Sequence, residues 1–453
     1  MRRIKLFQRY GKKGNTSQTK PLKDLTKIIP SEILLAEEKR DNLMKQIRNA
    51  SALDEARFDS LSLSLVNNFG NHCQNLPDTY SSYYSQQGGL LDHALNRTEA
   101  ALNLFQQYVI LDEQGELSED QSLWQYALFS AAILQGIGKL HIDYIVELYD
   151  NNGQLLKQWN PLLENLIEVG SYYNYEFQKE SSEEFRRRLN LLIARYVMPA
   201  SGFSWIASNS EVLAVWLALL NEDMEAAGTL GAILVRANAI AIQRYFNQFM
   251  LKAFGSRGSR YGRVGTFTGV PESVSEIEQQ IGIEFIQWLE KSLDGGKIMI
   301  NKAPLFMVPG GLMITSEVFD RFMMENPEYK NKQAVQNGFL SLGLHRLGAD
   351  GTPNSRFEQN SNQQMHSGIL FANYAVALPA NLQLHNMHTG KSVTISATEL
   401  IHQARLSSTY FTSKQATNSS VTAGHLNVAG QWQSEASSPS SQISLNPGVT
   451  NGV

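Results

Sequence analysis

Two adjacent tyrosines and a nearby histidine are the first reactive side chains of interest in the sequence. Tyr83 and Tyr84 precede a Gly-Gly pair, and His93 follows it in the stretch GGLLDHALNR. A tyrosine phenolate can attack a DNA phosphate and form a covalent intermediate, provided that a cation or arginines absorb the charge on the phosphate. The alternative interpretation is that both tyrosines are packing aromatics.

His93 lies on the apolar face of the helix predicted after the Gly-Gly pair. An imidazole can bind a divalent cation, which turns a bound water into a nucleophile near neutral pH. One imidazole without a nearby carboxylate does not hold a hard divalent ion tightly. His141 and Asp143 could add ligands only if a helix ends at Lys139, because side chains at i and i+2 point to different sides of a helix. Otherwise His93 is a buried, hydrogen-bonded histidine of a helical bundle.

Other familiar site patterns are missing from the sequence. The Gly-rich stretch GRVGTFTG at 262–269 lacks the Lys-Ser/Thr ending of a phosphate loop, so we expect no ATP-driven motor. Cys73 is the single cysteine, which excludes a Cys-x-x-Cys site and an intramolecular disulfide. A reducing cytoplasm is therefore the expected location.

The elements that must position these residues are predicted to be helices. Apolar residues recur at three- and four-residue steps, and strand-like alternation is scarce, up to about Leu251. The helical stretches are 32–50, 90–111, 122–135, 181–197 and 210–251. We therefore predict one all-α domain over 31–251.

Three segments outside this domain have the composition of arms, linkers and tails. Residues 1–30 are basic and predict a mobile arm. This arm either only increases solubility or attracts nucleic acid or acidic lipid. Residues 252–275 are rich in glycine and predict a linker. Residues 407–453 are rich in Ser, Thr, Asn and Gln and predict a disordered polar tail.

The linker also carries charge that could contact nucleic acid. Its three arginines are Arg257, Arg260 and Arg263. They could lie along DNA phosphates, and the alternative is that they form a basic tether without a ligand.

The pattern changes after the linker. Residues 275–296 predict an amphipathic helix closed by glycines, and two more helices are predicted at 316–329 and 331–346. Short apolar or alternating runs between them predict strands at 297–301, 305–315 and 368–378. We therefore predict a small α+β module over 276–400, in an element order compatible with a winged helix.

This winged-helix-like module would offer basic side chains to DNA, most of them near one helix and one on a possible wing. They are Lys330, Lys332, His345, Arg346 and, on the wing, Arg356. Contacts from such residues to backbone phosphates give an affinity that falls steeply with salt. The alternative is that the module only packs against the helical domain or a partner protein.

Composition limits the class of protein. The chain has 453 residues, 42% hydrophobic and 18% charged, which predicts a globular body of more than one domain. A net charge of -4 argues against a wholly basic nucleic-acid coat protein but allows local basic patches. No segment approaches the roughly 20 apolar residues of a membrane span, and the N-terminus lacks the apolar region of a secretory signal.

Several motifs together resemble a known family. GGLLDHALNR, AAILQGIGKL and LVRANAIAI resemble the HD-related N-terminal domain of MobH-class conjugative relaxases, the TraI-type proteins. The later stretches GIEFIQWLEKSLDGGKIMINKAPLFMVPGGLMITSEVFDRF, AVQNGFLSLGLHR and GILF resemble that family's C-terminal module. The resemblance covers roughly 76–378 in the family's order. It implies a bacterial protein that binds origin-of-transfer DNA, with a metal-dependent site that nicks one strand.

The family's metal ligands do not carry over to this sequence. Its histidine pair matches Tyr83 and Tyr84, its His-Asp pair matches Gln135 and Gly136, and its late aspartate matches Asn238. Of the family's site, His93 is retained, with Lys139 nearby. The resemblance therefore implies a degenerate metal site, with Tyr83, Tyr84, His93 and Lys139 as the remaining catalytic candidates.

The expected function is a relaxase-like DNA-processing protein of conjugative transfer or of an integrative conjugative element, without metal-dependent nicking. We expect no cofactor, unless a divergent site binds a divalent metal. One alternative is an active nickase that uses such a metal or a tyrosine. The other is a non-catalytic scaffold for further conjugation or mobilisation proteins.

Overall fold

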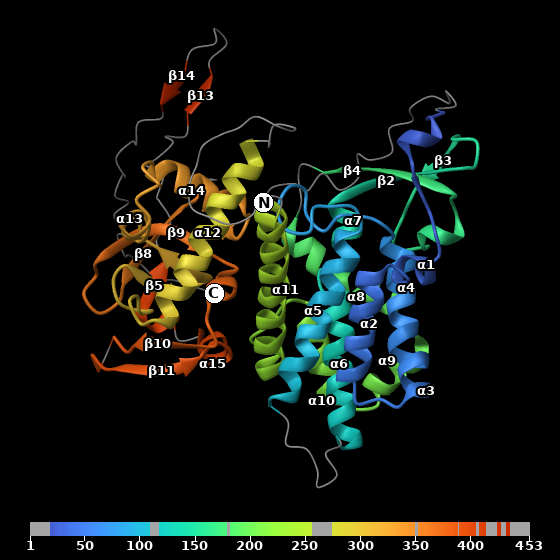
Figure 1. Cartoon of the computed structure of the whole chain (residues 1–453), viewed down its shortest axis with the longest axis horizontal. Helices are drawn as coiled ribbons and strands as arrows, with labels where there is room; N and C mark the ends of the chain where they lie inside the picture. The colour runs from blue at the N-terminus through green and yellow to red at the C-terminus, as the bar shows by residue number, and fades with distance from the viewer. Residues whose placement is uncertain are drawn as a thin grey trace, which may run out of the picture.

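The computed structural model describes residues 19–108, 117–178, 182–255, 274–348, 352–387, 389–404, 407–413, 424–426 and 432–434. Helices dominate the first part of the chain, and a second part is built on a larger antiparallel sheet (Figure 1). The multidomain organisation that the sequence predicted is therefore confirmed.

Two helices form the centre of the first domain, α5 (Gly89–Gln106) and α6 (Glu119–Leu134). Most of their side chains are buried on every side, which fits their content of alanine and leucine. Helix α6 begins at a capping box, in which Ser118 accepts from the backbone of Gln121 and the Gln121 side chain accepts in return. The remaining helices of this domain surround the pair: α1 (Ser31–Leu35), α2 (Glu38–Ala50), α3 (Glu55–Arg57), α4 (Ser64–Cys73), α7 (Lys139–Ile142), α8 (Glu183–Val197), α9 (Ala200–Ala207), α10 (Ser210–Leu220) and α11 (Gly228–Gly255).

The all-α prediction for this domain is wrong, because the domain carries a four-stranded antiparallel sheet. Its order is β1 (Thr26–Lys27), β4 (Tyr172–Phe177), β2 (Tyr144–Tyr149) and β3 (Leu155–Gln158). In β2 the buried Tyr144, Val146 and Leu148 alternate with less buried neighbours, as a half-buried strand requires. These runs are short and lie between long helices, so the helical periodicity around them dominated the sequence pattern.

The end of the predicted basic arm is also ordered. Residues 19–30, which we assigned to the arm, include β1, whose Thr26 pairs with Tyr173 of β4. The backbone N–H of Lys20 donates to the carbonyl of Gly153 at 2.9 Å. The first 18 residues lie outside the described part of the chain. The mobile-arm prediction therefore does not hold from Thr19 onward.

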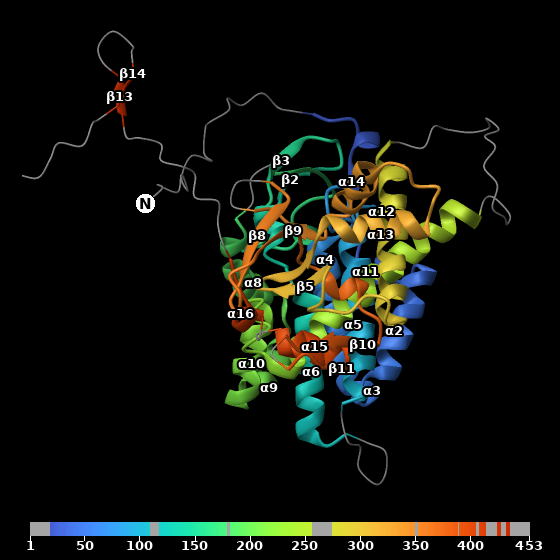
Figure 2. The ribbon, with the colours of Figure 1, turned by 90° about the vertical axis from the view of Figure 1, so that its left-hand side faces the viewer.

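The second domain begins with α12 (Val274–Asp294), as its amphipathic pattern predicted. A hairpin of β5 (Leu305–Val308) and β6 (Gly311–Ile314) follows, and then α13 (Ser316–Glu325) and α14 (Lys332–Ser341). Helices α13 and α14 lie side by side next to the sheet (Figure 2). The remaining elements are β7 (His345–Arg346), β8 (Asn354–Gln359), β9 (Met365–Phe371), β10 (Asn381–His385), β11 (Ser392–Ser396) and α15 (Ala397–Gln403).

The main sheet of this domain has the order β12-β8-β9-β6-β5, and β7 also pairs with β9. One face packs against α12, α13 and α14 in a core that contains Phe285, Phe319 and Phe339. The opposite face carries a smaller cluster around Phe306, Phe357 and other apolar side chains. The two faces therefore bury separate apolar clusters.

The start of the predicted disordered tail belongs to the second cluster. Helix α16 (Ser407–Tyr410) leads into β12 (Phe411–Ser413), which pairs with β8. The side chain of Phe411 is 1% exposed and lies against Phe306. The polar composition of the tail hid the two adjacent aromatics Tyr410 and Phe411, which both pack against this cluster. The prediction of disorder from residue 407 is therefore wrong for 407–413. A two-stranded hairpin, β13 (Gly424–Leu426) with β14 (Trp432–Ser434), is described farther on.

Helix α11 belongs to both domains. Its fully buried residues from Ile233 to Ala237 that belong to a core pack in the first one, while Ile242, Phe246 and Met250 pack in the second. The Arg236 guanidinium donates to the carbonyls of Ala375 and Leu378 at 2.9 and 2.8 Å. The sequence predicts that residues up to 251 belong to the first domain alone, whereas the two cores divide inside this helix. Residues 256–273, which contain most of the predicted linker, are outside the described residues.

We predict that Phe411→Ala destabilises the second domain by about 3–5 kcal/mol, since it removes a buried aromatic from a small cluster. Chemical denaturation of the full chain, followed by tryptophan fluorescence, measures the change. Ser413→Ala is the matched control, because Ser413 is exposed on the same strand. Equal stability of the two variants would contradict the docking of this segment.

Candidate functional site

A buried carboxylate, Asp78, lies at the centre of the candidate site. Its Oδ2 is 2.9 Å from Nδ1 of His93, and its Oδ1 is 2.5 Å from Nζ of Lys139. The Lys139 ammonium also donates to the Asp78 carbonyl at 3.2 Å. Burial alone would raise the pKa of Asp78, but the charges and hydrogen bonds of Lys139 and His93 hold it well below its usual value. The carboxylate is therefore ionised at neutral pH.

His93 is held on both its ring edge and its ring face. The side chain is 3% exposed, and burial lowers its pKa against the opposing effect of Asp78. Tyr84 stacks on the imidazole at 4.6 Å between ring centroids, and Tyr83 meets it edge-on at 5.6 Å. The second ring nitrogen, Nε2, is buried and has no hydrogen-bond partner among the described residues. One donor or acceptor position of His93 is thus unused.

The two tyrosines are in an environment that disfavours their phenolates. Tyr84 is 2% exposed, and its hydroxyl donates to the Ala241 carbonyl at 2.9 Å. Burial raises the pKa of Tyr84, and burial followed by the charge of Asp78 raises the pKa of Tyr83, which is half-buried. A tyrosine nucleophile would therefore need a base or a cation that changes this balance.

The backbone of the loop before α5 places these side chains. Tyr84 has a φ of 51°, a left-handed conformation that is rare for a bulky residue. Its carbonyl accepts from the N–H of Asp78 at 2.8 Å, so the loop closes on itself. A Cβ on Gly89 would collide with that carbonyl, which explains why a glycine starts the helix. Strain of this kind is common where a site is held in a fixed geometry.

Lys139 reaches Asp78 because the chain turns sharply after α6. Gly136 has a φ of 73°, which favours glycine, and α7 begins three residues later. The N–H of Gly138 donates to the Asn190 side chain at 2.7 Å. A Cβ on Gly138 would collide with the Arg186 carbonyl. The motif AAILQGIGKL therefore builds a tight corner that carries the lysine.

Gln135 and Asn238, two of the three predicted degenerate metal positions, lie next to a buried arginine that the sequence analysis did not single out. Arg97 is 5% exposed and donates from Nε to the Ala132 carbonyl at 2.8 Å. Its terminal nitrogens reach the Gln135 carbonyl at 3.4 Å and Oδ1 of Asn238 at 3.5 Å. The Oε1 atom of Gln135 is buried without a described partner.

The donors in this region do not fit a divalent metal ion. Such a site needs imidazole and carboxylate ligands that converge from several helices. In the part of the chain that the structure describes, no group of three or more His, Cys, Asp or Glu side chains is placed to hold one ion. Asp78 is already paired with Lys139, and Asp143 lies 3.7 Å from Arg186. The side chains of Gln135 and Asn238 are neutral amides, which are weak ligands for a divalent ion.

The basic residues predicted to bind DNA do not form one surface. Arg356 lies opposite Ser367 across β8 and β9, and Arg346 lies opposite Leu370. Because Ser367 and Leu370 are three apart on one strand, these arginines point to opposite faces of the sheet. Both are exposed, and His345 is half-buried with a pKa lowered by burial.

Two further predicted basic residues lie at the start of α14. Lys330 is exposed in the turn before α14, and Lys332, the first residue of that helix, lies 2.7 Å from Asp320. The linker arginines Arg257, Arg260 and Arg263 lie outside the described residues.

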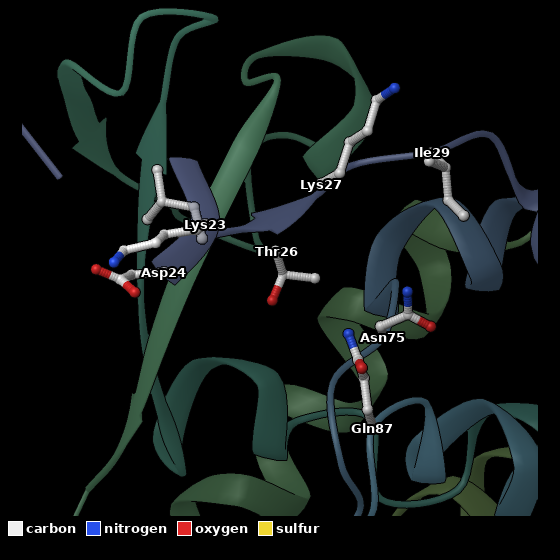
Figure 3. Close-up of a pocket in the computed structure, with 8 residues that line it drawn as sticks. Lys23, Asp24, Thr26, Lys27, Ile29, Asn75 and Gln87 are labelled. Atoms are coloured by element: carbon white, nitrogen blue, oxygen red, sulfur yellow. The ribbon is translucent and has the colours of Figure 1, made fainter. Parts of the chain in front are cut away.

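Two cavities are relevant to ligand binding. A groove of about 290 Å³ separates α13 and α14 from the β8–β9 hairpin and is lined by Ser316, Gln336 and Arg356, among others. A second cavity, of about 470 Å³, opens beside β1. Thr26, Asn75 and Gln87 lie on one side of it, and the Lys27 side chain points away (Figure 3). The second cavity does not include Asp78, His93 or Lys139.

Sequence reasoning missed Asp78 and Arg97 for different reasons. Asp78 lies in an irregular loop, where no periodicity indicates what a side chain will contact. Arg97 follows His93 by four residues on the same helix, so the spacing that places both on one face was visible in the sequence. A charged residue on an otherwise apolar face was the signal that could have found it.

None of the described helices is alone long and apolar enough to cross a membrane. One pair, α9 with α10, passes that test only together, and the two helices are bent by 118° relative to each other.

Comparison with known proteins gives a family for both parts of the chain. Residues 25–253 match the TraI_2 family model, described as "Putative helicase". Residues 280–391 match the model described as "Putative conjugal transfer nickase/helicase TraI C-term". Among curated proteins, none matches the chain. The two matches confirm the resemblance to TraI-type proteins and support a role in conjugative DNA processing. Because the first match spans just over half of the 453 residues, the chain belongs to the TraI_2 family.

Proposed function

We propose that this chain is a relaxase-like protein of conjugative transfer that binds DNA and does not nick it with a metal ion. The observation that carries this proposal is the Lys139 ammonium, which lies 2.5 Å from the carboxylate beside His93. The Lys139 side chain thus neutralises the buried Asp78 carboxylate without a bound ion. A divalent ion at this place would have to displace Lys139 and would then find one carboxylate and one imidazole.

The finer assignment belongs to the same proposal. The motifs around His93, Gln135 and Asn238 support an HD-related first domain of the MobH class with a degenerate site. Helices α12, α13 and α14 and the β8–β9 hairpin follow one another in the order of a winged helix and its wing. We propose the bacterial cytoplasm as its location and an integrative conjugative element as its genetic setting.

DNA binding is supported by the groove between α13, α14 and the β8–β9 hairpin. Arg356 projects from the hairpin into this groove, where Ser316, Gln336 and Asn354 add polar groups. A cleft that combines a helix, a hairpin arginine and uncharged donors suits contacts to a DNA backbone and to base edges. The origin-of-transfer region is the proposed target.

A tyrosine-dependent nickase is the alternative that one observation favours. Tyr83 is half-buried beside His93, and the charges of Arg186 and Arg97 act on its hydroxyl. Arginines near a phenol are what an attack on phosphate would need. A non-catalytic scaffold is the other alternative, and a complex with mobilisation proteins that forms without DNA would identify it.

We predict that the full chain binds duplex DNA with an affinity that falls tenfold or more between low and physiological salt, on the order expected for several phosphate contacts. Arg356→Ala should weaken binding and lower the salt slope by about one. Fluorescence anisotropy measures both. Arg188→Ala is the matched control, since Arg188 is exposed on α8 of the first domain. An affinity that changes neither with salt nor with Arg356→Ala, or that falls equally in Arg356→Ala and Arg188→Ala, would contradict the proposal.

With manganese, cobalt or iron and a supercoiled plasmid that carries an origin of transfer, we expect no relaxed product. The reason is that Lys139 already holds the carboxylate next to His93. Agarose electrophoresis measures the outcome. Relaxed product that disappears in Tyr83→Phe, Tyr84→Phe or His93→Ala would instead establish an active divergent site.

Lys139→Met should destabilise the protein by roughly 3–5 kcal/mol at pH 7, because it leaves a buried carboxylate without its cation. In the native protein the lowered pKa of Asp78 stabilises the fold above the unfolded pKa of about 4, and that contribution is lost as the pH falls below it. The deficit of the variant should therefore be largest at pH 7 and shrink as the pH falls, first because the unpaired, buried Asp78 of the variant takes up a proton and then, below about pH 4, because the native protein loses its own contribution. Urea unfolding at several pH values measures it, and a deficit independent of pH would contradict the ion pair.

A further inference from the structure

The charges around Arg97 do not balance. The two carboxylates whose charge acts on Arg97 are Asp78 and Glu222. Asp78 pairs with Lys139 at 2.5 Å, and Glu222 pairs with Arg187 at 3.3 Å. Among the described residues, no ion pair includes Arg97 itself. One buried positive charge therefore remains without a counter-ion in this part of the protein.

The contacts of Arg97 are with neutral groups. Its Nε donates to one carbonyl at 2.8 Å, and its terminal nitrogens reach a second carbonyl and an amide oxygen at 3.4 and 3.5 Å. Burial lowers the pKa of Arg97, as expected for a charge removed from water. A buried guanidinium normally gains a carboxylate or phosphate, which it can bind through two parallel N–H groups.

Other unsatisfied polar atoms lie next to this charge. Nε2 of His93, one turn before Arg97 on α5, is buried without a partner, and so is Oε1 of Gln135. Tyr83, Gln135 and Asn238 are only half-buried, so solvent reaches the edge of the cluster. The cluster thus combines an unpaired cation, an unused imidazole nitrogen and an accessible rim.

We propose that Arg97, with His93 beside it, binds a phosphate group of nucleic acid without a metal ion. The guanidinium provides the charge and two donors for the phosphate oxygens. Because Nδ1 of His93 faces Asp78, Nε2 adds a third donor only when the bound phosphate keeps the imidazole protonated. The proposal rests on the proposed DNA-binding function for the identity of its ligand. It adds a second contact point, in the first domain, to the groove around Arg356.

Asn238 gives the sharpest test, because it differs from aspartate by one atom. In Asn238→Asp a carboxylate would stand 3.5 Å from the Arg97 guanidinium and supply the missing counter-ion from within. Thermal stability should stay the same or rise, while the dissociation constant for phosphate should increase by about tenfold or more. Asn247→Asp is the matched control, since it makes the same change at an exposed position of α11.

The experiment titrates the full chain with inorganic phosphate and, at equal ionic strength, with sodium chloride, and records the thermal midpoint. We expect phosphate to raise the midpoint of the native chain and of Asn247→Asp, and to have little effect on Asn238→Asp. A chloride response equal to the phosphate response, or unchanged phosphate binding in Asn238→Asp, would overturn the proposal.

Short single strands with a 5′-phosphate or a 5′-hydroxyl then identify the source of the phosphate. Tighter binding of the 5′-phosphorylated strand that Asn238→Asp abolishes assigns the site to a strand end. Equal binding of the two strands, weakened by Asn238→Asp, assigns it to the backbone. Failure of the DNA-binding function would appear separately, as duplex binding insensitive to salt and to Arg356→Ala.

Discussion

The ion pair between Asp78 and Lys139 is the interaction on which the arrangement of the candidate site depends. It joins the loop before α5 to the corner after α6, and through His93 it also fixes the central helix. The Tyr144 hydroxyl donates to the Pro77 carbonyl, so the small sheet is tied to the same point. A buried ion pair contributes little net stability, but the loss of one partner is costly. The pair therefore constrains geometry more than it adds stability.

The same interaction underlies the proposal that the chain does not use a metal ion. A divalent cation would bring two positive charges to a place where the protein supplies one carboxylate. Lysine and arginine already exceed the carboxylates nearby, because the described contacts of Arg97 are with neutral groups, namely two backbone carbonyls and the Asn238 side chain. A region arranged in this way attracts anions and repels cations. The proposed absence of a metal ion and the proposed anion site would then have the same electrostatic origin.

The helices could be predicted because their apolar residues repeat over many turns, as in the stretches that became α5, α6 and α12. The sheet of the first domain was missed since its strands have only four to six residues each, apart from the shorter β1. In the candidate site, His93 and Lys139 were visible as unusual residues on helical stretches. Their partner Asp78 was not, because a contact made by an irregular loop is fixed by the tertiary fold and leaves no period in the sequence. Phe411 shows the same limit, because it and Tyr410 are a short aromatic pair in an otherwise polar stretch.

Helix α11 contributes to two cores, and this affects how the protein can be divided. The family models end and resume at residues 253 and 280, which invites separation of the two parts there. A fragment that ends at 253 would keep Ile242, Phe246 and Met250 but lose the second core that covers them. It would expose an apolar stripe on its last helix, and such stripes promote self-association. The boundaries of the two family matches are thus not a guide to fragments that can be expressed alone.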